Sequence, residues 1–314
     1  MRAYKNMKKS EIRKDYITNR YVIIAPGRKK RPHQFSETIT VSHKDSPFTP
    51  DKVAKKKIID SVGSGSNKVI AILNVFPAVT PNNPKAYGFQ EVIIETPNPN
   101  VRLADLSITQ ITNLFKMYQR RTKTLLKQKR LNYVLCFKNE GSEAGASISH
   151  AHSQIFATEI VPLRVVETRE RLSEHKIEHG HSLYTDIIKK EMKSSRRVFE
   201  DKYIAVFCPY ASAYENEVWI ISKREMVDST KLNDAEQLAF AKALKKVLQP
   251  LKEMNAPYNY FFHTLKGSSP EHICLRIQPR AHIWSGVELD SSMTVNWVAP
   301  EEAAKMYRKA FKKG

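Results

Sequence analysis

The sequence predicts an α+β protein made of two similar halves, and two observations lead to this prediction. The first is a repeat, because residues 88–157 and residues 214–280 present the same elements in the same order. Each copy has a strand, a loop, a long helix, a second strand, a loop of small residues and a final strand. The second observation is that both long helices begin with residues that favour a helix N-terminus. Elements in this order, present twice, imply two similar halves packed together.

The strands and helices of the two copies correspond. The first strands are EVIIET and EVWIIS, and the second strands are YVLCFK and YNYFFH. Ser107 with Gln110, and Asn233 with Glu236, have the spacing of a capping box. Pro250 is expected to kink or end the second helix. Each helix carries one apolar stripe, formed by Ile111, Leu114, Phe115, Tyr118, Leu125 and Leu126 in the first and by Phe240, Leu244, Val247, Leu248 and Leu251 in the second.

Composition places the chain among globular proteins. It has 314 residues, of which 41% are hydrophobic, and it contains three widely spaced cysteines. No apolar run approaches the roughly 20 residues that a membrane helix needs, and the basic N-terminus lacks the apolar core of a secretory signal. Few, unpaired cysteines suggest reduced thiols. We therefore expect a cytoplasmic protein that does not bind membranes.

The formal net charge of +20 has three explanations. It could serve nucleic-acid binding, it could attract small anionic substrates, or it could reflect solvated lysine-rich surfaces. The basic residues are scattered along the chain, which favours solvated surfaces and argues against a nucleic-acid partner.

The segment NEGSEAGASISHAHSQIFAT, residues 139–158, carries the clearest chemical signal. His150, His152 and Gln154 alternate with small or apolar residues, so in a strand they point to one face. In the second copy His272, Cys274 and Arg276 stand at the corresponding positions. Only the first half keeps the complete set, which predicts one active and one supporting half.

A neutral imidazole is a competent nucleophile at pH 7. Its attack on a phosphoryl group gives a phosphoramidate, which can pass that group to a second acceptor. A glutamine two residues on can donate an N–H to a phosphate oxygen, and the loop GSEAGAS at 141–147 suits close approach of a phosphate. The alternative is a strand with polar residues on a solvent-exposed face.

Five blocks in order resemble the galactose-1-phosphate uridylyltransferase family, within the histidine-triad superfamily. They read EIRKDYITNRYVIIAPGRKKRPHQF, LNVFPAV, GFQEVIIETP, NEGSEAGASISHAHSQI and SGVELDSSMTVNWVAPEEAAKMYR. The resemblance implies two histidine-triad-like halves related by internal duplication, with antiparallel sheets and helices packed on them. Residues 1–165 would carry the nucleophile, and a degenerate half, residues 166–314, would contribute to the substrate pocket.

The resemblance also implies a double displacement through a covalent nucleotidyl-histidine. His152 matches the nucleophile and Gln154 its partner amide, while His150 is expected to be structural. The residues that match substrate-binding positions are Arg28, Arg31, Asn74, Asn139, Ser147 and Glu288.

Many members of this family hold a zinc ion with a Cys-x-x-Cys pair and two histidines. Here Ser46, Thr49 and Pro99 stand at three of those positions and only His150 remains, too few ligands for a structural zinc. A second family metal site would keep His263 and His272, with Cys274 in place of one ligand and Glu167 or Glu170 as the acid. The cluster of His175, His179 and His181 is interpreted as a solvated helix end, with metal binding as the alternative. We therefore expect no cofactor.

The best-supported activity is transfer of UMP between UDP-glucose and a hexose 1-phosphate, galactose 1-phosphate in particular. The alternative within the family is an adenylyltransferase or phosphorylase acting on an ADP-sugar or a dinucleotide polyphosphate. A nucleotide hydrolase and a nucleotide-binding protein without catalysis are the alternatives from other classes. The expected partners are a nucleotide sugar, a sugar 1-phosphate and a second copy of the chain, since the family often forms homodimers.

Overall fold

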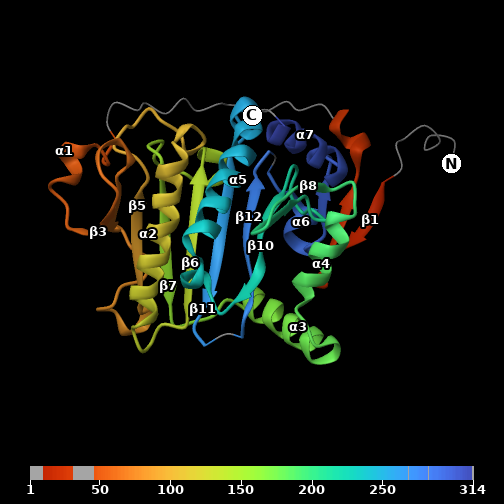
Figure 1. Ribbon diagram of the computed structural model, residues 1–314, viewed down its shortest axis with the longest axis horizontal. Helices are drawn as coiled ribbons and strands as arrows, with labels where there is room; N and C mark the ends of the chain where they lie inside the picture. Colours follow the sequence, from red (N-terminus) through yellow and green to blue (C-terminus); the bar gives the residue numbers. More distant parts are fainter. Residues whose placement is uncertain (1–9, 31–45, 268, 282, 313–314) are drawn as a thin grey trace.

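A ten-stranded sheet runs through the molecule (Figure 1). The computed structural model describes residues 10–30, 46–267, 269–281 and 283–312. All neighbouring strands of this sheet are antiparallel. In spatial order they are β3 (Ile58–Val62), β4 (Val69–Leu73), β5 (Gly88–Ile94), β7 (His152–Thr158), β6 (Tyr133–Glu140), β11 (Tyr258–Leu265), β12 (Glu271–Pro279), β10 (Val218–Met226), β9 (Ile204–Phe207) and β8 (Arg197–Glu200).

The two repeated segments contribute strands in the same order. The first gives β5-β7-β6 and the second gives β10-β12-β11. The strands β6 and β11 pair over eight residues, from Tyr133 with Leu265 to Glu140 with Tyr258. The predicted α+β class with antiparallel strands is therefore confirmed, and the halves share one continuous sheet.

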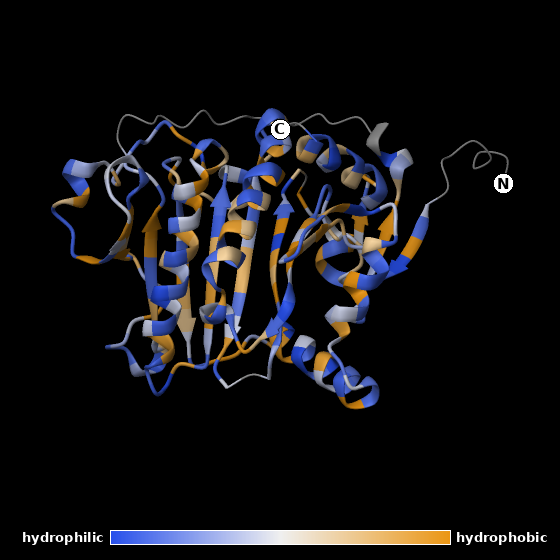
Figure 2. Cartoon of the chain, viewed as in Figure 1, coloured by the Kyte–Doolittle hydropathy of each residue, from blue (hydrophilic) through white to orange (hydrophobic). Residues whose placement is uncertain are grey.

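Two long helices, α2 (Ile108–Leu126) and α5 (Asp234–Glu253), lie side by side on one face of this sheet. Their hydrophobic residues face the sheet and their hydrophilic residues face outward (Figure 2). Ser107 accepts a hydrogen bond from the backbone N–H of Gln110, and Asn233 and Glu236 form the reciprocal capping box. Pro250 lies in the last turn of α5, which ends at Glu253. Both predicted helix starts are confirmed.

The other face of the sheet carries helices at its two ends. Over the second half, α3 (Leu163–His179) and α4 (Leu183–Met192) cover a cluster that includes Phe207 and Trp219. Over the first half, the short helix α1 (Pro50–Val53) and the preceding Phe48 cover Ile72, Val92 and Ile94. The strands β7, β6 and β11 lie between these two clusters.

A second sheet of three strands joins the two ends of the chain. It consists of β1 (Glu11–Lys14), β2 (Tyr21–Ile24) and β13 (Thr294–Asn296), with β13 parallel to β2. The N-terminal strands, which precede the first repeated segment in sequence, thus form a sheet with a strand that follows the second repeated segment. The last helices are α6 (Gly286–Ser291) and α7 (Pro300–Lys312). Short 3₁₀ turns are η2 (Pro26–Lys30), η3 (Gly65–Asn67), η4 (Pro84–Ala86), η5 (Leu103–Asp105), η6 (Ser142–Ala144) and η7 (Ser229–Lys231).

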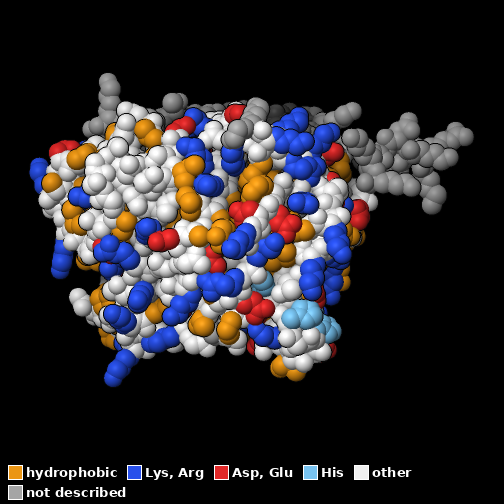
Figure 3. Space-filling model, viewed as in Figure 1, with side chains coloured by type: hydrophobic (Ala, Val, Ile, Leu, Met, Phe, Trp, Pro, Cys, Tyr) orange, Lys and Arg blue, Asp and Glu red, His pale blue; other side chains and the backbone are white. Residues whose placement is uncertain are grey.

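Figure 3 shows how charged side chains are distributed over one face of the molecule. Lysine and arginine side chains are spread over the face seen in Figure 3 and do not form a single stripe. Among the described residues, no helix has both the length and the apolar character required to cross a membrane.

A buried ion pair ties β5, β6 and β7 together. The ammonium group of Lys138, only 1% exposed, donates to Glu95 Oε2 at 2.9 Å and to the carbonyl oxygen of His152 at 2.9 Å. A second carboxylate, Glu140, lies 3.2 Å away. Although burial lowers it, these two carboxylates raise the pKa of Lys138 above its ordinary value, so the ammonium group is charged. Burial raises the pKa of Glu95, and the charge of Lys138 opposes that rise.

We expect Lys138→Met to lower the free energy of unfolding by about 3–5 kcal/mol, because it leaves Glu95 buried without a counter-charge. Urea denaturation measures this change. The exposed substitution Lys123→Met should change the same quantity by less than about 0.5 kcal/mol. The double variant Lys138→Met/Glu95→Leu should recover much of the loss; a double variant as unstable as Lys138→Met alone would contradict the ion-pair explanation.

Candidate active site

His152 is the first residue of β7, and the hydrogen bond at its Nδ1 fixes its tautomer. Nδ1 lies 2.8 Å from the carbonyl oxygen of His150. A carbonyl oxygen only accepts, so Nδ1 carries the proton and Nε2 keeps its lone pair. No hydrogen bond joins Nε2 to any of the described residues. The imidazole is therefore oriented with its nucleophilic nitrogen unengaged.

The surroundings of His152 keep it neutral. The residue is 7% exposed, and the ring of Phe48 lies 5.1 Å from the imidazole, centroid to centroid. Burial, together with the nearby positive charge of Lys138, lowers the pKa of His152 to about 4. At pH 7 the imidazole is unprotonated and able to attack a phosphorus atom.

The pairing of the strands places His152 and Gln154 on the face away from α2 and α5. In the register of β5 and β7, Ile94 lies opposite His152 and Val92 lies opposite Gln154. Both isoleucine and valine belong to the cluster under α1, while Ser153 points to the opposite face. Directly opposed residues share a face of a sheet. The His-x-His-x-Gln alternation thus aims two reactive groups at one side, as the sequence predicted.

The amide of Gln154 has a defined orientation. Its Oε1 accepts a hydrogen bond from Gln90 Nε2 at 2.9 Å, and Asn74 Nδ2 lies at 3.4 Å from the same oxygen. Gln90 is itself oriented, because its Oε1 accepts from the backbone N–H of Ala78. Asn74 is oriented in the same way by the backbone N–H of Phe76. With Oε1 occupied, Gln154 presents its NH₂ group as the free donor.

Gln90 is a site residue that the sequence reasoning missed. It alternates with Val92 and Ile94 along β5, so its side chain lies on the same face as Gln154. The signal that could have identified Gln90 is its position in a strand that pairs with the strand of the histidines. The order of the strands, which local sequence does not reveal, was needed to see it.

Asn139 supports the loop that leads to the histidines. Its Oδ1 accepts from Asn259 Nδ2 at 2.9 Å, its Nδ2 donates to the carbonyl oxygen of Gly145 at 3.3 Å, and Asn259 also bonds the carbonyl oxygen of Ala144. Gly145 has φ of 84°, a conformation that favours glycine. Ser147 follows in this loop and is exposed. Asn259, from the second half, is another residue that the sequence analysis did not find.

Both ring nitrogens of His150 are engaged. Nε2 donates to the carbonyl oxygen of Thr96 at 2.7 Å, so Nδ1 accepts from the Ser46 hydroxyl at 2.8 Å. The residue is 1% exposed and holds the strand β7 against these two segments. The zinc site of the family does not fit here, because Ser46, Thr49 and Pro99 offer no thiolate or imidazole.

The second half repeats this arrangement at His272. Nδ1 donates to the carbonyl oxygen of Ser222 at 2.7 Å, so Nε2 accepts from the Thr185 hydroxyl at 3.0 Å. The segments that supply the hydroxyls read SPFT at 46–49 and SLYT at 182–185. A serine or threonine hydroxyl thus meets the first histidine of the motif in each half.

His263 and His272 line a cavity of about 310 Å³ together with Cys274 and Arg276. His263 Nδ1 lies 2.6 Å from the Tyr133 hydroxyl. Glu167 and Glu170, considered as acidic ligands, are exposed and do not line this cavity. Among the described residues, none of these side chains belongs to a group of three or more metal-ligating residues.

The structure does not bring Arg28 and Glu288 to His152. Arg28 is exposed in η2, directly after β2, and Glu288 lies in α6 close to β13. Glu288 accepts hydrogen bonds from the backbone and hydroxyl of Ser285, and so caps its own helix. The β1–β2–β13 sheet lies at the opposite end of the molecule from β5 and β7 (Figure 1). Arg31 lies outside the described residues.

Comparison with known proteins identifies the family. Residues 79–162 match the family described as galactose-1-phosphate uridyl transferase, N-terminal domain. An ADP-glucose phosphorylase of Arabidopsis thaliana is 30% identical over 328 residues, which cover 95% of this chain and 92% of the relative. A galactose-1-phosphate uridylyltransferase of Thermotoga maritima is 26% identical over 318 residues, covering 95% and 98%.

Solved structures agree with these matches. The crystal structure of the Arabidopsis ADP-glucose phosphorylase with bound ADP-glucose superimposes with a TM-score of 0.83 at 29% identity, covering 96% of this chain and 99% of that one. A structure of uridylyltransferase gives 0.75 at 28% identity, covering 97% and 99%. The fold and these relatives together show that the chain is a nucleotidyltransferase and belongs to the galactose-1-phosphate uridylyltransferase family.

Proposed function

We propose that this enzyme cleaves a nucleoside diphosphate sugar through a covalent nucleotidyl-His152 intermediate. The observation that carries the proposal is the hydrogen bond from His152 Nδ1 to the carbonyl oxygen of His150. It leaves the lone pair of Nε2 on the same face as the free NH₂ group of Gln154. A nucleophile next to a donor for a phosphate oxygen is what transfer of a phosphoryl-type group requires.

In the first step, His152 Nε2 attacks the α-phosphorus of the nucleotide sugar. A P–N bond forms, the P–O bond to the sugar phosphate breaks, and the sugar 1-phosphate leaves. Gln154 donates to a non-bridging oxygen as negative charge develops there. The imidazole gains a positive charge, and its Nδ1–H bond to the His150 carbonyl oxygen strengthens accordingly.

In the second step, an oxygen of the acceptor attacks the same phosphorus and the P–N bond breaks, which restores neutral His152. Inorganic phosphate as acceptor gives a nucleoside diphosphate, as in a phosphorylase. A hexose 1-phosphate as acceptor gives a new nucleotide sugar, as in a uridylyltransferase. The first step is common to both reactions.

We favour an ADP-sugar as donor and phosphate as acceptor. Support comes from the ADP-glucose phosphorylase of A. thaliana, which is more similar to this chain than the T. maritima uridylyltransferase, at 30% against 26% identity. Transfer of UMP between UDP-glucose and galactose 1-phosphate is the second candidate, supported by the T. maritima relative.

Phe76, 91% exposed and two residues beyond Asn74, offers an aromatic face to either base. A homodimer and a cytoplasmic location stay predictions.

Intact-protein mass spectrometry tests the covalent intermediate and the base together. After mixing with ADP-glucose alone, we expect a gain of one AMP, and with UDP-glucose a smaller fraction carrying UMP. His152→Ala should show neither adduct, whereas His263→Ala, which removes a solvent-exposed histidine from the lining of the neighbouring cavity, should keep the adduct. An equal adduct in His152→Ala would contradict His152 as the nucleophile, and a larger UMP fraction would favour the second candidate.

The rate of adduct formation should be insensitive to pH between 8 and 5.5. The low pKa of His152, about 4, means that the imidazole is still unprotonated at pH 5.5 and loses activity only as the pH falls towards 4. A histidine with an ordinary pKa of about 6.5 would lose most of its neutral form over the same range. Single-turnover quench experiments measure the rate; a midpoint close to pH 6.5 would show that His152 is not desolvated as described.

Gln90 is a positioning residue for Gln154. We expect Gln154→Leu to slow adduct formation roughly 100-fold, the effect of removing one transition-state donor. Gln90→Leu should slow it less, by about 10-fold, because it only lets the Gln154 amide rotate. Gln128→Leu, at an exposed position, is the matched control and should keep the wild-type rate. If Gln90→Leu lowers only substrate affinity and leaves the single-turnover rate at saturation unchanged, Gln90 does not act through Gln154.

A further inference from the structure

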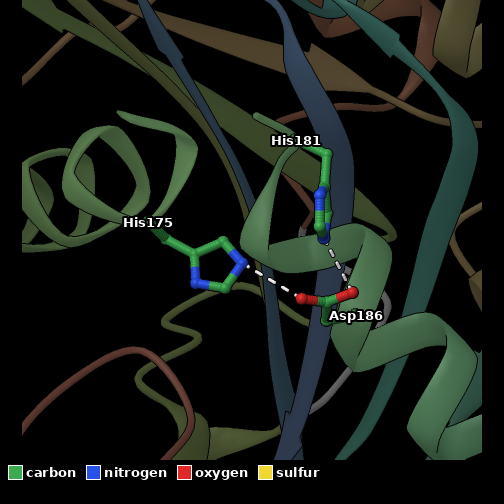
Figure 4. Close-up of side chains that lie close together, drawn as sticks. All are labelled: His175, His181 and Asp186. Atoms are coloured by element: carbon green, nitrogen blue, oxygen red, sulfur yellow. Dashed lines mark hydrogen bonds and ion pairs between the residues drawn. The ribbon is translucent and has the colours of Figure 1, made fainter. Parts of the chain in front are cut away.

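A cluster of histidines lies at the turn between α3 and α4, away from His152. Three of the ten histidines of the chain, His175, His179 and His181, occur here. Figure 4 shows the imidazoles of His175 and His181 converging on the carboxylate of Asp186 from α4. His175 Nε2 lies 3.1 Å from Asp186 Oδ2, and His181 Nε2 lies 2.9 Å from Asp186 Oδ1.

The environment of this cluster differs from the solvated helix end that the sequence suggested. His175 is only 6% exposed, because it is one of the three residues of α3 that face the protein. His179 is half-exposed, and its ring lies 4.2 Å from that of His175, centroid to centroid. The ligand atoms of His175, His181 and Asp186 all lie within 4.8 Å of one another. The interpretation of His175 as solvated was therefore wrong.

The hydrogen bond at His181 Nδ1 leaves the lone pair of its Nε2 facing the carboxylate of Asp186. Its Nδ1 lies 2.8 Å from the carbonyl oxygen of His179, which can only accept, so Nδ1 carries a proton. A neutral imidazole has no second N–H, so its Nε2 would then face the carboxylate with a lone pair. A contact of 2.9 Å between two acceptors is repulsive. Either a second proton or a metal ion makes this contact favourable.

The spacing suits a metal ion. Zinc binds imidazole nitrogen and carboxylate oxygen at about 2.0–2.2 Å in tetrahedral geometry, which sets neighbouring ligand atoms roughly 3.3 Å apart. The nitrogen–oxygen distances, 3.1 Å from His175 to Oδ2 and 2.9 Å from His181 to Oδ1, involve different oxygens of Asp186 and are each within a few tenths of an ångström of that value. One ligand atom from each of the three residues lies within 4.8 Å of the other two. The backbone carbonyl that holds His181 Nδ1 is the outer-sphere partner that metal-binding histidines usually have.

We propose that His175, His181 and Asp186 bind a divalent transition-metal ion, with water in the fourth position. Two imidazoles and one carboxylate favour Zn²⁺, Co²⁺ or Ni²⁺ over the oxygen-preferring Mg²⁺ and Ca²⁺. None of these residues corresponds to the family positions at Ser46, Thr49 and His150. The site is therefore independent of the one that the chain has lost.

The position of the site indicates what the ion would do. Helix α3 is weakly held, because Leu163 and Ile177 are 72% and 83% exposed, and its buried residues are Val165, Leu172 and His175. The same helix forms one wall of the 310 Å³ cavity, and Tyr184 of α4 lines that cavity too. A metal ion would join the end of α3 to α4 and so fix this wall.

Metal binding by tag-free, metal-stripped protein tests the proposal. Titration with Zn²⁺ by calorimetry and with Co²⁺ by visible absorption should reveal one site in the wild type. We expect His181→Gln and Asp186→Asn to weaken binding at that site by at least about 10-fold. Glu174→Gln is the matched control, because it removes an exposed carboxylate next to His175 without removing a ligand, and it should bind as the wild type does.

Three outcomes decide between metal and proton. Loss of the site in both ligand variants, with circular dichroism unchanged, supports the proposal. Equal binding in wild type, His181→Gln and Asp186→Asn overturns it, since any metal bound then sits elsewhere. Absence of binding of either ion at pH 7.5 also overturns it. Formation of the His152 adduct in all these variants keeps this test separate from the proposed function.

Discussion

The hydrogen bond between His152 Nδ1 and the carbonyl oxygen of His150 is the interaction on which the active site depends. It fixes the tautomer, and so leaves Nε2 with its lone pair. Its geometry in turn depends on the strand β7 being held in place. The ammonium group of Lys138 holds the carbonyl oxygen of His152, and the ring of His150 is held between Ser46 and the carbonyl oxygen of Thr96. A buried ion pair and a buried imidazole thus position one reactive nitrogen.

At four histidines one ring nitrogen donates a hydrogen bond to a backbone carbonyl oxygen. The group that faces the other ring nitrogen differs among the four histidines and distinguishes their roles. At His150 and His272 that partner is a hydroxyl, from Ser46 and Thr185, and both rings are structural. At His181 the partner is the carboxylate of Asp186, and a cation between the two groups would stabilise this contact. At His152 the other nitrogen has no partner among the described residues, and it is the one that can attack phosphorus. Four similar imidazoles therefore take three roles.

The two halves share their strand order but not their chemistry. Cys274 occupies the position in β12 that corresponds to His152, and burial raises the pKa of its thiol to about 11, so it is protonated at neutral pH and a poor nucleophile. Arg276 stands where the first half has Gln154, and it donates to the Tyr184 hydroxyl and lies over the ring of Trp219. Cys274, Arg276 and Tyr184 line the cavity of about 310 Å³ described above. The second half contacts the first through Asn259 and through the pairing of β11 with β6.

The sequence by itself determined the α+β class, the starts of α2 and α5, and the common face of His152 and Gln154. The class rests on the order of elements that the chain presents twice, whereas the helix starts and the common face rest on residues two or three positions apart, where helix capping and strand alternation act. The tertiary structure decided the rest. It makes Gln90 the hydrogen-bond partner of Gln154 and Ser46 that of His150, and it brings Lys138 to the carbonyl oxygen of His152. It also places Arg28 and Glu288 far from His152. It also decided that His175 is buried against α4. These contacts join segments up to 104 residues apart, as Ser46 and His150 show. Strand order and helix packing create them, and no local pattern in the chain encodes either.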